Sequence, residues 1–176
     1  MTARRGRSAV DLNRRAPLDE AVDVVVPPAL RRIAYIPGVG DNVAPMLSQL
    51  GLGVTVVDAA EIARTDFSGY DAVVVGTRAY ESRPELVASN ARLLEYVRNG
   101  GTMVVQYGQY EMQQPGIMPY PIVLSRPQQR VTLENAPVRM LRPEHRLLNV
   151  PNRITERDFE GWVQERSLYM PVQFDE

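Results

Sequence analysis

The chain has 176 residues, enough for one domain or for one domain with a tail. Its 20 basic residues are all arginine, lysine and cysteine are absent, and His145 is the one histidine. These counts exclude a cysteine nucleophile, a disulfide, a zinc–thiolate site, a Schiff-base lysine and a P-loop lysine within this chain. One histidine also cannot build a metal centre of two or three histidines.

The formal net charge of −1 gives no overall attraction to nucleic acid or to an anionic membrane, and we expect neither as a partner. Residues 1–15 are basic, with five arginines and one acidic residue. The Arg4-Arg5 pair could begin an export signal, but Asp11 and Asn13 interrupt the apolar run that such a signal needs. We therefore expect residues 1–30 to be a disordered leader and linker.

No apolar stretch exceeds the length of a strand, so the sequence predicts no membrane-spanning segment. As written, the chain is expected to be cytoplasmic, or to belong to a longer exported protein whose signal lies elsewhere.

Four apolar runs predict strands at residues 33–36, 54–57, 70–76 and 102–107. The apolar part of the third run, Ala72 to Val75, does not alternate with polar residues. Both of its faces are therefore expected to be covered, as in a parallel sheet.

Two amphipathic helices are predicted between these strands. The first can be capped by Asp41 or Asn42, ends at Gly51, and has an apolar face made of Val43, Met46, Leu47 and Leu50. The second begins at a capping box of Ser82 and Glu85 and has an apolar face made of Val87, Ala91, Leu94 and Val97. A shorter helical turn is expected around residues 59–63.

Strands and helices that alternate with short connections predict right-handed βαβ units, and hence a flavodoxin-like, doubly wound parallel sheet of the α/β class. Prolines recur every few residues after Tyr107, and extended pieces are expected near residues 122–124, 131–133 and 138–141. The predicted organisation is therefore a leader at 1–30, an α/β core at 31–124 and an extension at 125–176. This proline-rich, partly β-strand extension should pack on the core at the carboxyl ends of the strands, where open α/β sheets hold their sites.

Two motifs at strand ends resemble parts of a dinucleotide-binding site, but the fingerprint of such a site is incomplete. Gly38-Val39-Gly40 follows the first strand, but the third glycine of the fingerprint is replaced by Val43. Asp58 ends the second strand where a ribose-binding acid would lie, and without the glycines it is expected to cap a helix.

The turn after the third strand, Gly76 to Tyr80, lies where related folds place a nucleophile elbow. Such an elbow requires serine or cysteine, and the turn offers only Thr77. Arg78 at this turn could bind an anion or pair with Glu81 or Glu85, and the ion pair is favoured. Arg78 and Tyr80 are retained as ligand-binding candidates.

His145 is a candidate general base, with Glu144 or Asp158 as the orienting carboxylate. A histidine that opens a short helical turn more often caps the turn or lies on the surface, and that interpretation is favoured.

Residues 158–166 form the densest polar and aromatic cluster of the sequence. Trp162 could stack on a sugar ring while Gln164, Glu165 and Arg166 bind its hydroxyl groups. Alternatively, Trp162 packs the proline-rich segment on the sheet while the charged side chains pair with one another. The two interpretations carry equal weight.

Several strings together resemble one known family: residues 32–41, 70–80, 99–107, 151–154 and 161–166. They are similar to the C-terminal region of large bacterial PIG-L (LmbE-like) deacetylase proteins, a region similar in fold to class I glutamine amidotransferases. The resemblance covers about residues 31–176.

The resemblance implies an association with a zinc-dependent hydrolase that removes acetyl groups from N-acetylglucosamine-type sugars. The hydrolase belongs to the family's N-terminal domain, and its Pro-His-Pro-Asp-Asp-Glu motif is missing here, as is the amidotransferase cysteine. No catalytic residue is carried over, and zinc is expected only in the separate hydrolase domain, with no cofactor in this chain. Because the family region continues with a further strand and helix, a fragment of a longer protein is expected.

The sequence thus predicts a non-catalytic accessory domain of a PIG-L-type deacetylase system. It would bind carbohydrate or pack against the hydrolase domain, and an open sheet edge makes a second copy of the chain a further expected partner. The alternative is a small hydrolase that uses His145 with Glu144, Asp158 or Glu165.

Overall fold

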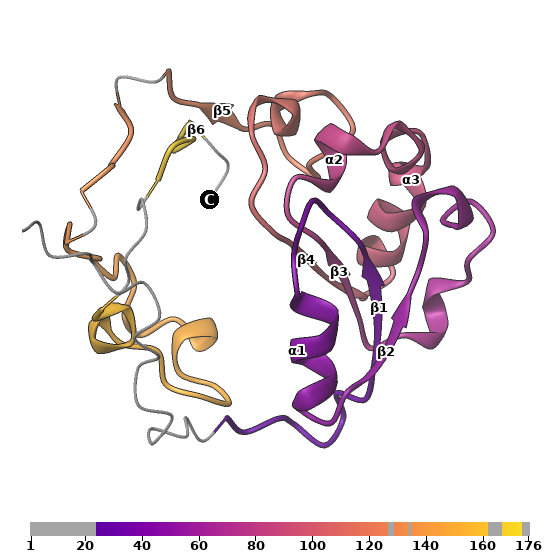
Figure 1. Cartoon of the computed structure of the whole chain (residues 1–176), viewed down its shortest axis with the longest axis horizontal. Coiled ribbons are helices and arrows are strands. Elements are labelled where there is room, and N and C mark those ends of the chain that lie inside the picture. The colour runs from indigo at the N-terminus through magenta and orange to yellow at the C-terminus, as the bar shows by residue number, and fades with distance from the viewer. Residues whose placement is uncertain (1–23, 127–128, 134, 162–166, 174–176) are drawn as a thin grey trace, which may run out of the picture.

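The computed structural model describes residues 24–126, 129–133, 135–161 and 167–173. Four parallel strands form the main sheet: β1 (Arg32–Ile36), β2 (Gly53–Val56), β3 (Ala72–Val75) and β4 (Thr102–Val105). Their order in the sheet is β2-β1-β3-β4 (Figure 1). The chain therefore leaves β1 toward one edge and then returns to build the other, which confirms the flavodoxin-like α/β fold.

Both faces of the two central strands are buried, as the uninterrupted apolar runs predict. Side chains from β1 and β3 on one face, Ala34 and Val73 among them, pack with the long helix α3 (Pro84–Arg98). On the other face Ile33 and Val74 pack with the short helix α1 (Val43–Gln49). Figure 1 shows α1 and α3 on opposite sides of the sheet.

The loops around β2 follow the predicted turn chemistry. Helix α1 is followed by Gly51, whose φ of +80° needs the freedom of glycine. After β2, the carboxylate of Asp58 accepts a hydrogen bond from the backbone N–H of Ala60 and caps the 3₁₀-helix Ala59–Glu61. The capping role expected for Asp58 is thereby confirmed.

The second predicted helix forms as α3, but it starts differently and its apolar face is only partly as predicted. Of the predicted face, Leu94 is buried and Val87 packs against the core. A short helix α2 (Ala79–Ser82) precedes α3, and the Ser82 hydroxyl donates to the Arg78 carbonyl instead of forming a capping box with Glu85. Arg83 is the N-cap of α3 and has no side-chain capping bond. The face that the helix buries consists of Leu86, Asn90, Leu93 and Leu94, while Ala91 is exposed.

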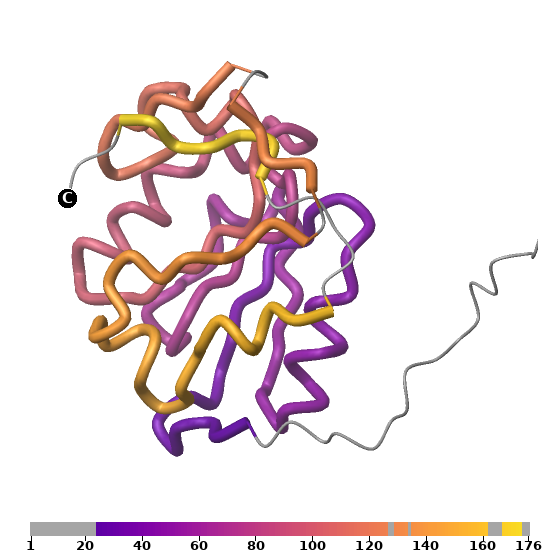
Figure 2. Tube along the Cα trace, turned by 90° about the vertical axis from the view of Figure 1, so that its left-hand side faces the viewer, coloured from indigo at the N-terminus to yellow at the C-terminus, as the bar shows by residue number. Residues whose placement is uncertain are grey.

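The described part of the proline-rich extension contains little regular structure. A short antiparallel pair joins β5 (Val123–Leu124) to β6 (Pro171–Gln173), and Val131 forms a single bridge with Ser167. The extended piece expected near residues 138–141 forms no strand; Pro137 and Pro143 flank it, and each lacks a backbone N–H. Figures 1 and 2 show the extension on the same side of the sheet as α1.

At the start of the described chain, the backbone of Val25 exchanges two hydrogen bonds with the Asn152 side chain, of 2.8 and 3.0 Å. Within the described part of the chain, no helix is both long and apolar enough to cross a membrane.

Candidate functional site

The carboxyl ends of β1 and β3 meet where the strand order reverses, and the two loops that follow are packed tightly together. The N–H of Val39 donates to the Thr77 carbonyl over 2.8 Å. A Cβ atom on Gly38 would collide with the backbone of Thr77, and one on Gly76 would lie 2.7 Å from the Asp41 carboxylate. Glycine is needed at both positions because the loops approach too closely for any side chain.

Tyr35 and Asp41 hold the loop after β1 against the strand that precedes it. The Tyr35 hydroxyl donates to Oδ1 of Asp41, and burial, followed by the neighbouring Asp41 carboxylate, raises the Tyr35 pKa above its usual range. The same Oδ1 accepts the Val43 N–H over 3.2 Å at the start of α1. Asp41 therefore holds the loop and the helix start in place.

Arg78 occupies the elbow after β3. Its φ of +55° makes it the one non-glycine residue with positive φ in the described part of the chain. The guanidinium makes two hydrogen bonds to the Glu81 carboxylate, of 2.6 and 2.7 Å. This pairing lowers the Glu81 pKa and raises the Arg78 pKa, so both groups remain charged. The ion pair favoured by the sequence is thus formed, with Glu81.

Three tyrosines, which we call the tyrosine cluster, lie beside this elbow: Tyr107, Tyr110 and Tyr169. The rings of Tyr110 and Tyr169 meet edge to face at 4.8 Å, and those of Tyr107 and Tyr169 at 6.1 Å. Tyr107 is 44 % and Tyr110 39 % exposed. The Arg78 N–H donates to the Tyr107 carbonyl over 2.7 Å, which joins the elbow to the cluster.

Sequence reasoning missed the tyrosine cluster. The apolar pattern places Tyr107 in a strand, and Tyr169 follows it by more than sixty residues. A local signal did exist, because Tyr107 and Tyr110 directly follow β4, where open α/β sheets place ligand-binding residues.

Tyr80, a predicted ligand-binding residue, lies in the core and is 5 % exposed. Its hydroxyl donates to Oδ1 of the buried Asn90 over 2.6 Å, and burial raises its pKa above the usual range. The Asn90 amide in turn donates to the carbonyls of Gly116 and Ile117. Tyr80 therefore completes a buried hydrogen-bond network and is not available to a ligand.

The predicted catalytic candidates are engaged in local turns of the extension. Nδ1 of His145 accepts the Leu147 N–H over 3.2 Å and caps the 3₁₀-helix Arg146–Leu148. Asp158 forms a capping box with Thr155, whose backbone N–H lowers the Asp158 pKa. Glu144 is exposed in the preceding turn.

A hollow of about 420 Å³ lies in this part of the extension, and neither His145 nor Asp158 lines it. Its lining includes Asn149 and residues 153–157. His145 therefore caps a helical turn, which is the interpretation that the sequence favoured over a general base.

The candidates Trp162, Gln164, Glu165 and Arg166 lie outside the described residues. The described chain resumes at Ser167, which pairs with Val131, and continues to Tyr169 of the tyrosine cluster.

Within the described ranges, no group of three or more histidine or acidic side chains is placed to hold a metal ion. The fold and the loops at its carboxyl edge define an α/β protein with a flavodoxin-like parallel sheet. Comparison of the chain with protein-family models, curated proteins and solved structures finds no match.

Proposed function

We propose that this chain is a non-catalytic α/β accessory domain that binds carbohydrate at the carboxyl edge of its sheet. The observation that carries the proposal is the elbow after β3. It presents Arg78, already paired with Glu81, beside partly exposed tyrosine rings.

The elbow has the strained geometry that displays a nucleophile in related folds, but its side chain has no nucleophilic atom. A guanidinium remains protonated at all ordinary pH values, and the pairing with Glu81 raises its pKa further. The neighbouring Thr77 hydroxyl is directed to the Gln106 side chain at 3.4 Å. In the described part of the chain, the side-chain partner of the Thr77 hydroxyl is an amide, which is not a base that activates a hydroxyl.

The surroundings of the elbow suit a polyhydroxylated ligand. Tyrosine rings offer apolar surface for the C–H face of a sugar. The Tyr110 hydroxyl donates to the Ser125 carbonyl over 3.2 Å and can still accept a hydrogen bond from a sugar hydroxyl. Gln106 and Glu111 follow β4 in the same loop and add amide and carboxylate groups. A few polar groups around aromatic surface is the usual composition of a small-ligand site.

The resemblance to the C-terminal region of PIG-L proteins supplies the biological setting of the proposal. The domain would assist a separate zinc-dependent hydrolase that acts on N-acetylated sugars, by binding the substrate chain or by packing against the hydrolase domain.

The test is a calorimetric titration of the full chain with an N-acetylglucosamine trimer and with the matched glucose trimer. We expect Tyr107→Ala to weaken binding roughly fivefold to tenfold, since an aromatic contact contributes about 1 kcal/mol beyond its buried area. Tyr120→Ala is the matched control, because Tyr120 is 63 % exposed and lies outside the tyrosine cluster. Absence of sugar binding by the unmodified chain, or equal losses in both variants, would contradict the proposal.

The proposal that the chain is not a catalyst is tested by an assay for deacetylation of amino-sugar substrates. We expect no turnover by this chain alone. Metal-independent activity that disappears in His145→Ala would establish the hydrolase alternative instead.

A further inference from the structure

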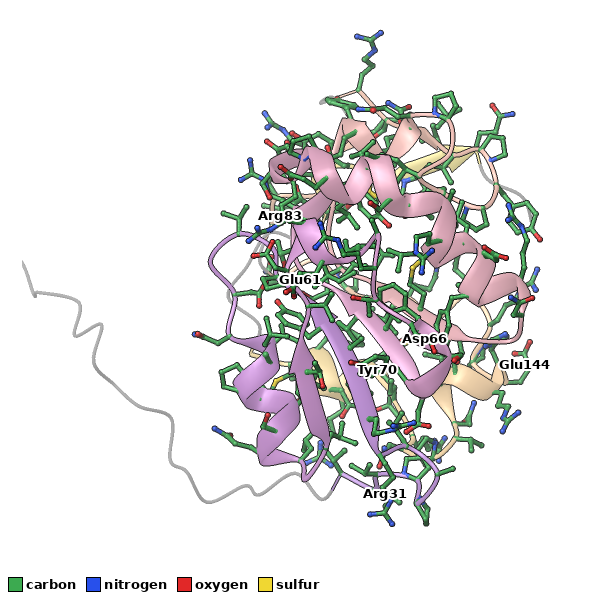
Figure 3. All side chains as sticks on the ribbon, turned by 90° about the vertical axis from the view of Figure 1, so that its right-hand side faces the viewer. Arg31, Glu61, Asp66, Tyr70, Arg83 and Glu144 are labelled. Atoms are coloured by element: carbon green, nitrogen blue, oxygen red, sulfur yellow. The ribbon has the colours of Figure 1, made fainter. Side chains whose placement is uncertain are left out.

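A cavity lies at the amino-terminal edge of the sheet, opposite the edge that carries the elbow after β3. Its volume is about 400 Å³, and it opens to solvent between the loop before β3, the last turns of α3 and the turn that leads to β4. We call it the amino-edge cavity; it is lined by Asp66, Phe67, Ser68, Tyr70, Asp71, Arg92, Glu95, Tyr96, Asn99, Gly100 and Gly101. Figure 3 shows Asp66 and Tyr70 next to each other, with Arg83 toward the other end of the sheet.

Aromatic rings form a fixed wall of this cavity. Phe67 is buried, and its ring lies 6.4 Å from that of Tyr70 and 6.2 Å from that of Tyr96. The Tyr96 hydroxyl donates to the Tyr70 carbonyl over 3.1 Å. The Tyr96 ring also covers Gly101 so closely that a Cβ atom there would overlap it. The two tyrosines are therefore positioned before any ligand binds.

The charged groups around the cavity are mostly acidic. Asp66, Asp71 and Glu95 contribute three carboxylates, against one guanidinium from Arg92. Hydrogen bonds to the carboxylates lower the pKa of both aspartates, from Ser68 to Asp66 and from the Arg32 and Arg31 N–H groups to Asp71. Both aspartates therefore stay ionised at neutral pH.

Two further features add negative potential and leave an acceptor free. The carbonyl end of the 15-residue helix α3 lies at the cavity, where the helix dipole is negative. Within the described residues the Glu95 carboxylate makes no hydrogen bond or ion pair, whereas the Arg92 guanidinium donates to the Thr65 carbonyl over 2.9 Å. The cavity thus offers an unpaired carboxylate beside aromatic rings.

We propose that the amino-edge cavity binds a small organic cation with a guanidinium or ammonium group. The cation lies against the rings of Tyr70 and Tyr96 and donates hydrogen bonds to Glu95, the arrangement that aromatic rings and carboxylates favour for such groups. A metal ion does not fit, since the described acidic side chains are too dispersed to coordinate one. This site is independent of the sugar site proposed at the carboxyl edge.

The test measures binding of Nα-acetyl-argininamide and Nα-acetyl-citrullinamide, called argininamide and citrullinamide below, to the full chain by chemical-shift titration. Acetylation removes the α-ammonium group that the two probes would otherwise share. The two probes differ only at the end of the side chain, where argininamide has a charged guanidinium and citrullinamide has a neutral urea. We expect argininamide to bind and citrullinamide to bind roughly threefold to tenfold more weakly, the effect of one partly exposed charge pair. Equal binding of the two probes would overturn the proposal.

Two variants with opposite expected effects separate a cation from a neutral ligand. Glu95→Gln should weaken argininamide binding, because it removes the carboxylate charge at nearly constant shape. Arg92→Gln should strengthen it, because it removes a positive charge that repels the cation. A neutral, hydrogen-bonded ligand would lose affinity in both variants, and that result would overturn the proposal.

Glu85→Gln is the matched control at the other end of α3 and should leave binding unchanged. Circular dichroism of every variant checks that the fold is intact. A blocked Gly-Arg-Gly peptide that binds more tightly than argininamide would overturn the assignment to a small free cation.

Discussion

The α/β core and the proline-rich extension use their apolar residues in different ways. Every buried hydrophobic side chain in the described ranges lies between Ile33 and Leu124. In the extension, Leu141 and Leu147 are 78 % and 76 % exposed. Apolar residues in uninterrupted runs form strands that pair and stack, whereas those separated by prolines have no repeating partner against which to pack.

The extension is instead attached by a few hydrogen-bonded contacts. These are the β5–β6 pair and the bond from the Tyr110 hydroxyl to the Ser125 carbonyl, beside the contact of the Tyr169 ring with the core tyrosines. Asn152 is bonded to Val25, in the segment before β1. Contacts of this kind open locally at lower free energy than a packed core. The difference implies that the core sets the global stability and that the extension contributes little to it.

The largest effect is expected for a truncation in the core. Leu93 is fully buried, and Leu93→Ala should lower the free energy of unfolding by about 2–5 kcal/mol, because it removes apolar contact and leaves a cavity. The matched change in the extension, Leu147→Ala, should cost less than about 0.5 kcal/mol. Urea unfolding of both variants measures the difference. Similar losses would show that the extension unfolds together with the core.

A smaller loss of stability is expected from a change in the hydrogen bonds that hold the loop between the core and the extension. Tyr80→Phe removes the donor to Asn90, whose amide holds the Gly116 and Ile117 carbonyls. An unpaired buried acceptor costs about 1–3 kcal/mol, so the melting temperature should fall measurably. Tyr120→Phe, at an exposed position, should leave it unchanged. No change in Tyr80→Phe would mean that the network does not stabilise the fold.

The smallest effect concerns stability at acid pH. The pKa of Asp71 is lowered in the folded chain by the N–H groups of Arg32 and Arg31. Its ionised form is therefore favoured by folding, and the stabilisation is complete above the ordinary value of 3.8 and is lost as the pH falls below it. Asp71→Asn should make the loss of melting temperature between about pH 5 and pH 2 shallower.

Asp158→Asn is the counterpart of this change in the extension. Its pKa is lowered by the Thr155 N–H, but the turn that it caps carries no buried side chain. Global melting should therefore be insensitive to this substitution at any pH. An equal change in the acid profiles of both variants would remove the distinction between core and extension.

Much of the core follows from local patterns in the sequence. The four apolar runs predict the strands, although the ends of the runs near Tyr70 and Tyr107 continue past the paired residues. Helix α3 is less predictable, because Asn90 lies on its buried face. Asn90 can be buried because its side-chain amide makes hydrogen bonds to the Tyr80 hydroxyl and to two backbone carbonyls. These partners lie outside the helix, so its own sequence does not reveal them.

The candidate sites show the same division. The pairing of Arg78 with Glu81 joins residues three apart on one turn, so that local reasoning can find it. The amino-edge cavity combines a loop before β3 with the end of α3, and no short motif marks it.

The sequence by itself determined the chemistry that is absent, with no thiol, no lysine and one histidine, and it determined the alternation of strands and helices. Periodicity and composition are local properties, so they can be read along the chain. Only the tertiary structure decided that Arg78 meets the tyrosine cluster and that Tyr80 is buried. Those outcomes depend on which elements pack together, because side chains far apart in the chain become neighbours only when the sheet has formed.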